Sequence, residues 1–173
     1  LTLPDGWKPI GGLKPGQLGA GTGVNIRPFS GTFDGDGHLL TVPEGGLPLL
    51  GYVRGAYVKN LDIYGTKIAG YGLVNNYDVD YGPTGIYGDY TKTATYPFMP
   101  LTVEIDNVTL KSGTQTLKSG FIGGYASGAN TVNLFGCTVE TGVVIGYNKD
   151  QSEIGSFAGD LNGTLVNCVS SAD

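Results

Sequence analysis

Residues 58–63 read VKNLDI, and the same pattern recurs as IDNVTL at 105–110, LFGCTV at 134–139 and LVNCVS at 165–170. When the four segments are aligned on their fourth residue, apolar side chains occupy three shared positions, with Ser170 as the exception. These aligned columns are Val58, Ile105, Leu134 and Leu165; Leu61, Val108, Cys137 and Cys168; and Ile63, Leu110, Val139 and Ser170. We call this alignment the repeat template.

The spacing within the repeat template predicts a bent strand. A spacing of two residues keeps both side chains on one face of a strand, whereas a spacing of three does not. The first and fourth residues can therefore face one core only if the backbone turns between them. The residue before the fourth position is Asn60, Asn107, Gly136 or Asn167, and Asn and Gly tolerate a positive φ most readily. We expect a one-residue corner at each of these positions.

The distance between repeats favours a stacked array. The fourth positions of successive segments are separated by 47, 29 and 31 residues, and periods of 20 to 50 residues are typical of stacked repeats. A short apolar run that contains Gly precedes three of the segments, at 49–53, 121–126 and 156–161. Helical periodicity is almost absent, and a sandwich or barrel would place turn signals every 8 to 12 residues. We therefore expect an all-β, right-handed parallel β-helix (solenoid), with residues 1–173 as one domain.

The longest interval contains an excess of about 17 residues, which predicts an insertion in the stretch at about 75–100, where Tyr, Asp and Pro are crowded without any period. Flat rings beside hydrogen-bond acceptors suit sugar faces and hydroxyl groups, and long loops on rigid scaffolds often carry function. The alternative is that the rings pack the insertion onto the stack and cover its open edge. The candidate ligand-binding residues are Tyr77, Asp78, Asp80, Tyr81, Tyr87, Asp89, Tyr90 and Tyr96.

Composition excludes several functional classes. Gly accounts for 31 of the 173 residues, well above the usual ~7%, but the absence of a Gly-X-Y period argues against collagen. The formal net charge is -5 and the basic residues are scattered, so we expect neither nucleic-acid binding nor membrane insertion. The sequence begins LTLPDGW, without Met or a signal peptide, and we interpret the chain as a fragment of a larger protein.

The remaining reactive residues favour structural roles. Residues 34–37 read DGDG, which is similar to the start of a calcium loop but lacks its twelfth-position Glu and also suits a tight turn. His38 has no second His nearby, so we expect a structural or surface histidine and no transition-metal site. Cys137 and Cys168 share one template position; a disulfide between them is geometrically possible, but we expect two buried free thiols.

The outward positions beside the template predict no catalytic pair. No acid is stacked on another acid there, and Lys59 beside Asp106 is the only charged pair. Glycosidic cleavage needs two positioned carboxyl groups, or a base with charge neutralisation. We therefore expect no catalytic residue, no metal and no cofactor.

Three stretches resemble a known family: GWKPIG at 6–11, FSGTFDGDGHLLTV at 29–42 and LPLLGYVRGAYVKNLDIYG at 47–65. They are similar to the GLUG-type repeats of secreted bacterial surface proteins, although LLG at 49–51 replaces the full G-L-F-G and the Tyr-rich insertion is not part of the pattern. The resemblance implies a β-helix exported by a bacterium, often fused to sugar-binding or immunoglobulin-like modules, and it implies no catalytic residue.

The expected function is that of a non-enzymatic extracellular surface, adhesion or stalk module that binds glycan through its Tyr-rich insertion. The expected partners are a host or dietary glycan and the flanking domains of the parent protein, at the surface of a bacterium or secreted from it. The alternative is an accessory or partial domain of a carbohydrate-active enzyme, either a polysaccharide lyase or a hydrolase.

Overall fold

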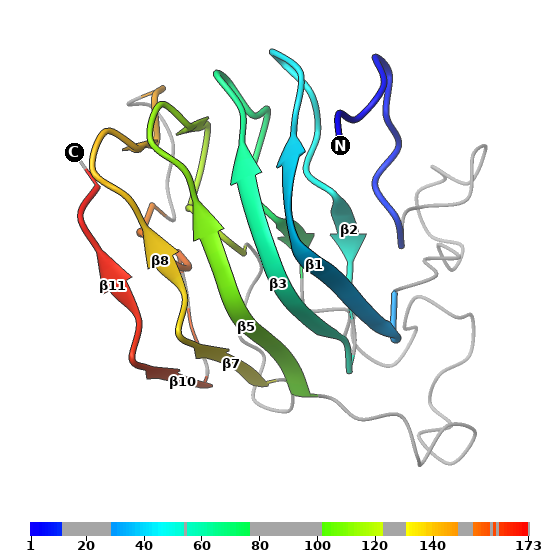
Figure 1. Ribbon diagram of the computed structural model, residues 1–173, viewed down its shortest axis with the longest axis vertical. Coiled ribbons are helices and arrows are strands. Elements are labelled where there is room, and N and C mark those ends of the chain that lie inside the picture. Colours follow the sequence, from blue (N-terminus) through cyan, green and yellow to red (C-terminus); the bar gives the residue numbers. More distant parts are fainter. Residues whose placement is uncertain are drawn as a thin grey trace, which may run out of the picture.

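A computed structural model describes residues 1–11, 29–53, 55–76, 102–122, 131–148, 154–159, 161 and 163–172. Within these ranges the chain forms strands and no helix (Figure 1). The strands are β1 (Thr32–Thr41), β2 (Leu50–Tyr52), β3 (Tyr57–Tyr64), β4 (Val74–Asn76), β5 (Thr102–Leu110), β6 (Gln115–Thr116), β7 (Thr131–Phe135), β8 (Thr138–Val139), β9 (Val144–Ile145), β10 (Gly163–Val166) and β11 (Val169–Ser170). None of the described residues belongs to a helix that could cross a membrane.

The main sheet has the order β1-β3-β5-β7-β10, with β8 and β11 continuing the last two of these strands beyond a corner. All of its pairings are parallel. The register follows the repeat template, because Val58 lies opposite Ile105, Ile105 opposite Leu134, and Leu134 opposite Leu165. The two ends of the chain lie at opposite ends of this sheet (Figure 1). The prediction of an all-β protein with parallel strands is confirmed.

The predicted corners are also confirmed. The backbone φ is +53° at Asn60, +51° at Asn107, +58° at Gly136 and +53° at Asn167. Each corner lets the side chains before and after it point to the same core, as the three-residue spacing requires.

One strand of the main sheet was missed in the sequence. In β1, His38 lies opposite Leu61 and Asp34 lies opposite Lys59, so that residues 35–37 face only Asn60. This bulge includes Asp36, with a φ of +51°. The two additional residues hide the template spacing, which explains why the first repeat could not be aligned with the other four.

Two shorter parallel ladders run beside the main sheet. The second ladder pairs β2 with β4 and continues through single bridges from Val74 to Ile122 and from Ile122 to Ala158. The third ladder pairs β6 with β9, and Ile68 joins it through a bridge to Thr116. From β3 onward the chain contributes first to the main sheet, then to the third ladder and then to the second ladder. It passes through the three in this order three times before it reaches β10.

The predicted Gly-containing runs contribute members of the second ladder: Leu50, Ile122 and Ala158. A further member, Val74, follows Gly72 and was not recognised. Glycine is required here because neighbouring backbones approach closely: a Cβ added at Gly72 would lie 1.9 Å from the carbonyl oxygen of Gly120. A Cβ added at Gly120 would lie 2.0 Å from the carbonyl oxygen of Ser156.

The core lies between the main sheet and the two shorter ladders. The rings of Phe121 and Phe157 stack with their centroids 5.5 Å apart and their planes at 17°. Template residues before the last repeat are fully or almost fully buried, namely Val58, Leu61, Ile63, Ile105, Val108, Leu110, Leu134, Cys137 and Val139. Burial of this apolar surface supplies most of the stabilisation that such a chain requires.

Candidate functional site

The predicted ligand-binding residues, from Tyr77 to Tyr96, all lie within 77–101, outside the described residues. Their proposed role therefore stays a prediction. The ends of this stretch are described: β4 ends at Asn76, and β5 begins at Thr102. The insertion that we placed at about 75–100 therefore also stays a prediction, apart from residues 75 and 76, which belong to β4.

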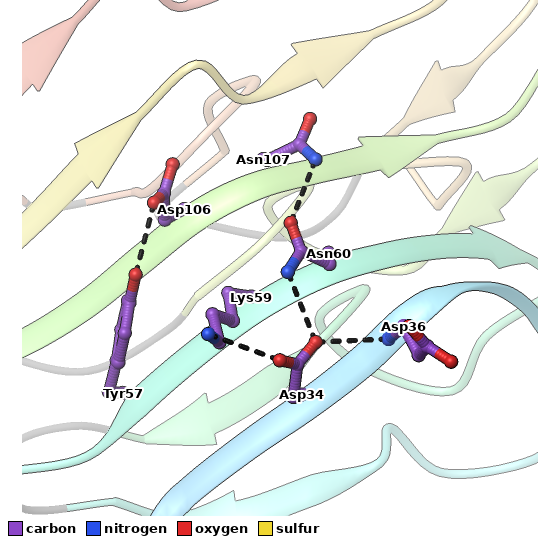
Figure 2. A network of polar contacts seen from close by, with 7 residues as sticks. All are labelled: Asp34, Asp36, Tyr57, Lys59, Asn60, Asp106 and Asn107. Carbon is purple, nitrogen blue, oxygen red and sulfur yellow. Dashed lines mark hydrogen bonds and ion pairs between the residues drawn. The ribbon is translucent and has the colours of Figure 1, made fainter.

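A network of polar side chains covers the outward face of β1, β3 and β5 (Figure 2). At its centre the Asp34 carboxylate accepts a hydrogen bond from the backbone N–H of Asp36 at 3.0 Å. The same carboxylate accepts a hydrogen bond from the Asn60 amide at 3.1 Å and forms an ion pair with Lys59 at 3.1 Å. We call these contacts, together with those of Tyr57, Asp106 and Asn107 described below, the Asp34 network.

The corner asparagines extend this network across the strands. The amide nitrogen of Asn107 donates to the amide oxygen of Asn60 at 3.0 Å, and Asn60 in turn donates to Asp34 (Figure 2). Each of these residues lies on a different strand of the main sheet. The hydrogen bonds therefore join β5, β3 and β1 at the level of their corners.

These contacts keep the Asp34 carboxylate ionised. Its pKa lies below the ordinary value because the backbone N–H of Asp36, the Asn60 amide and Lys59 all stabilise the charged form. The pKa of Lys59 is raised by the same ion pair. A general acid needs a raised pKa, so Asp34 is suited to organising the corner and not to donating a proton.

Tyr57 connects β3 to β5. Its hydroxyl donates a hydrogen bond to the Asp106 carboxylate at 3.1 Å, and this bond raises the pKa of Tyr57. The Lys59 ammonium lies 5.5 Å from the centroid of the Tyr57 ring, within the range of a cation–π contact.

The prediction that Lys59 lies near Asp106 is confirmed by the register. The two residues lie opposite each other in the register, but Lys59 forms its ion pair with Asp34 on the other neighbouring strand. Asp106 instead accepts the hydroxyl of Tyr57. The partner was missed because Asp34 belongs to the strand whose bulge hides the template.

A second charged cluster lies near the carboxyl ends of β3, β5 and β8, and its Asp62 is still part of β3. Lys111 forms an ion pair with Glu140, and its ammonium lies 3.8 Å from the Asp62 carboxylate. Lys111 and then the backbone N–H of Ser112 lower the pKa of Glu140. Lys111 and Glu140 each follow the last template residue of their repeats, so extending the alignment by one position would have found this pair.

The other singled-out residues have structural surroundings. The Nδ1 atom of His38 lies 3.0 Å from the carbonyl oxygen of Gly35, within the bulge of β1. Among the described residues, no three His, Cys, Asp or Glu side chains are grouped closely enough to hold a metal ion.

Both cysteines are free thiols, but only one is buried. The Cys137 thiol donates to the carbonyl oxygen of Ile105 at 3.4 Å, and burial raises its pKa to about 12. The Cys168 thiol donates to the carbonyl oxygen of Leu134 at 3.4 Å but is only partly buried. The expectation that both thiols are buried is therefore wrong for Cys168, because no described strand covers the last repeat.

Comparisons of the chain with protein-family models, curated proteins and solved structures found no match. The class of protein to which the chain belongs is therefore defined by its fold and its polar network alone. It is an all-β protein with parallel strands, whose outward polar groups are bonded mainly to one another across neighbouring strands.

Proposed function

We propose that the chain is a right-handed parallel β-helix that acts as a non-catalytic stalk or adhesion module of a secreted or surface-attached bacterial protein. The observation that carries this proposal is the order of the ladders. From β3 onward the chain passes from the main sheet to the third ladder and then to the second. Each segment in a ladder pairs with the equivalent segment of the preceding round. Parallel crossover connections are right-handed in about 98% of cases.

The Asp34 network supports a scaffold role. Its charged and polar groups are engaged with one another, from Asn107 through Asn60 to the Asp34 and Lys59 ion pair. Groups that bridge neighbouring strands in this way hold the repeats in register and leave no titratable pair poised for proton transfer. A stack of repeats that contact only their neighbours is an efficient spacer.

Glycan binding through the Tyr-rich insertion is the second part of the proposal. Residues 77–101 are followed directly by Thr102, the first residue of β5, and Glu104, two residues further on, lies opposite Tyr57. The described part of the main sheet that follows the insertion in the sequence therefore includes the Asp106 carboxylate and the partly exposed ring of Tyr57 that contacts it. Aromatic rings and carboxylates together can bind sugar faces and hydroxyl groups.

A glycan array probed with the intact chain tests the binding role. A variant with Tyr81, Tyr87 and Tyr90 replaced by Ala should lose binding and keep its melting temperature within about 2 °C, because surface changes usually cost under ~0.5 kcal/mol. Absence of binding by the intact chain, together with a strongly destabilised triple variant, would show that the rings cover the stack. The stalk role would then stand without a glycan.

A further inference from the structure

Cys137 and Cys168 lie side by side in neighbouring repeats of the main sheet. The register pairs the residues that follow them, Thr138 and Val169, and each cysteine comes directly after a corner with a positive φ. The backbone N–H of Val169 donates a hydrogen bond of 2.9 Å to the carbonyl oxygen of Cys137, which joins the two strands at this point. The two cysteine backbones are therefore about one strand spacing apart, or ~4.8 Å.

The two thiols face the same core. Cys137 belongs to the buried core cluster, and Cys168 packs against this cluster. The Cys168 thiol donates to the carbonyl oxygen of Leu134 at 3.4 Å, so its sulfur is directed toward the repeat that contains Cys137. The two thiols also form a hydrogen bond with each other. Disulfides join residues whose Cα atoms are about 4.4–6.8 Å apart, and one strand spacing falls within this range.

The core restricts when the two sulfurs can react. Burial raises the pKa of the Cys137 thiol to about 12, so almost no thiolate forms at neutral pH while the chain is folded. The thiolate is the form that attacks a disulfide. A bond between the two cysteines would therefore form while the chain folds, before the core closes over Cys137, and the same burial would then protect the bond from reducing thiols.

We propose that folding under oxidising conditions joins Cys137 and Cys168 in a disulfide, which fastens the repeat of β10 and β11 to the repeat of β7 and β8. The oxidant is a small-molecule disulfide such as oxidised glutathione. The thiolate of one cysteine attacks a sulfur of the oxidant, so that a mixed disulfide forms and one glutathione leaves. The thiolate of the other cysteine then attacks the cysteine sulfur of the mixed disulfide and releases the second glutathione. The two cysteines together lose two protons and two electrons, and the oxidant is reduced to two thiols.

The bond would close a loop that contains one complete round of the stack. Residues 138–167 include β8, β9, the bridge residue Ala158 and β10. A cross-link across such a loop lowers the entropy of the unfolded chain and so stabilises the folded one, provided that the native geometry accepts it. The proposal depends on the register of the main sheet and not on the proposed surface role, so a negative glycan array does not affect it.

The effective concentration of the two thiols tests the proposal. The chain is equilibrated with mixtures of reduced and oxidised glutathione, once without denaturant and once in urea that unfolds it. Equilibrium is established by starting from the reduced and from the oxidised chain, and the products are quenched with acid and identified by mass. The effective concentration should be at least about 100-fold higher in the folded chain than in urea, as expected for a loop of this size without strain.

Moving one thiol by a single residue provides the matched control. In a variant with Cys168→Ala and Val169→Cys, the second thiol lies on the outward face of the same strand, because successive side chains alternate between faces. The loop between the two thiols is almost unchanged in length, so the value in urea should be the same. In the folded variant the effective concentration should be no higher than in urea. Thermal melting of the reduced variant confirms that it is folded.

Three outcomes would overturn the proposal. The first is an effective concentration in the folded original chain that is equal to or lower than the value in urea, because the native arrangement would then resist the bond. The second is an equal gain on folding in the control variant, because the bond would then not require thiols that face the same core. The third is oxidation that gives only dimers or glutathione adducts, without a monomer two hydrogen masses lighter than the reduced chain.

Discussion

The side-chain amide of Asn107 donates a hydrogen bond of 3.0 Å to the side-chain oxygen of Asn60, and both residues have a backbone φ near +50°. The same residues therefore turn the strand and join it to its neighbour. On one side the chain of hydrogen bonds ends at the Asp34 carboxylate. On the other side it stops at Gly136, the one corner in this series without a side chain.

Replacing Gly136 with Asn should extend the chain of hydrogen bonds from Asn107 toward Asn167. The φ at Gly136 is +58°, and nothing lies within 4 Å of an added Cβ. Asn tolerates this conformation, whereas Ala loses about 1–2 kcal/mol in it, and each net hydrogen bond contributes about 1 kcal/mol. Gly136→Asn should therefore be about 2 kcal/mol more stable than the control Gly136→Ala in urea unfolding. Equal stability of the two variants would mean that the corner side chains do not interact.

Replacing Val108 with Asp should unfold the protein. Val108 is fully buried in the central template column, and an unpaired buried charge costs more than about 4 kcal/mol. Thr138→Asp is the matched control, because Thr138 lies on the outward face of the neighbouring strand, opposite Thr109. Circular dichroism melts should show loss of cooperative unfolding for Val108→Asp alone. A cooperative melt of Val108→Asp at the temperature of the original protein would contradict the inward assignment of this column.

The register and the corners could be predicted because they depend on local geometry. A three-residue spacing between inward side chains requires a turn, and Asn or Gly at the intervening position supplies it. The strand β1 could not be recognised by the same rule, since residues 35–37 occupy the place of one corner residue. A bulge changes the spacing without changing the face of the strand that is buried.

The candidate site was less predictable because its contacts join residues whose alignment had to be known first. Lys59 could be placed beside Asp106, but its ion pair with Asp34 depends on the register of β1. Exposure of Cys168 could not be anticipated either, because burial of a template residue depends on the strand that follows it. The template describes which side chains each strand directs toward the core, whereas the exposure of those side chains depends on the strands that pair with both edges of that strand.

Replacing Gly120 with Ala should destabilise the protein by about 2–3 kcal/mol, the usual cost of forcing extra atoms into a packed core. The added Cβ would lie 2.0 Å from the carbonyl oxygen of Ser156, so one backbone must move. In Gly31→Ala the new Cβ would lie 3.3 Å from the ring of Phe29, which can adjust. This control should change the free energy of unfolding by less than about 1 kcal/mol. Similar urea midpoints for the two variants would show that the ladders are not packed this closely.

Alkaline pH should destabilise the protein through Cys137. Burial raises the pKa of this thiol to about 12 from an ordinary value of 9.0, so the folded state disfavours the thiolate that the unfolded state forms more readily. Stability from this group is therefore complete below pH 9 and is lost as the pH rises toward 12. Between pH 9 and pH 11 the loss should be about 2–3 kcal/mol, at 1.36 kcal/mol for each pH unit. Urea unfolding with reductant present should show this loss, and Cys137→Ala should lack that part of it. An identical alkaline loss in Cys137→Ala would assign the effect to other groups, such as the Lys59 and Lys111 ion pairs, whose raised pKa values also make their contribution disappear at high pH.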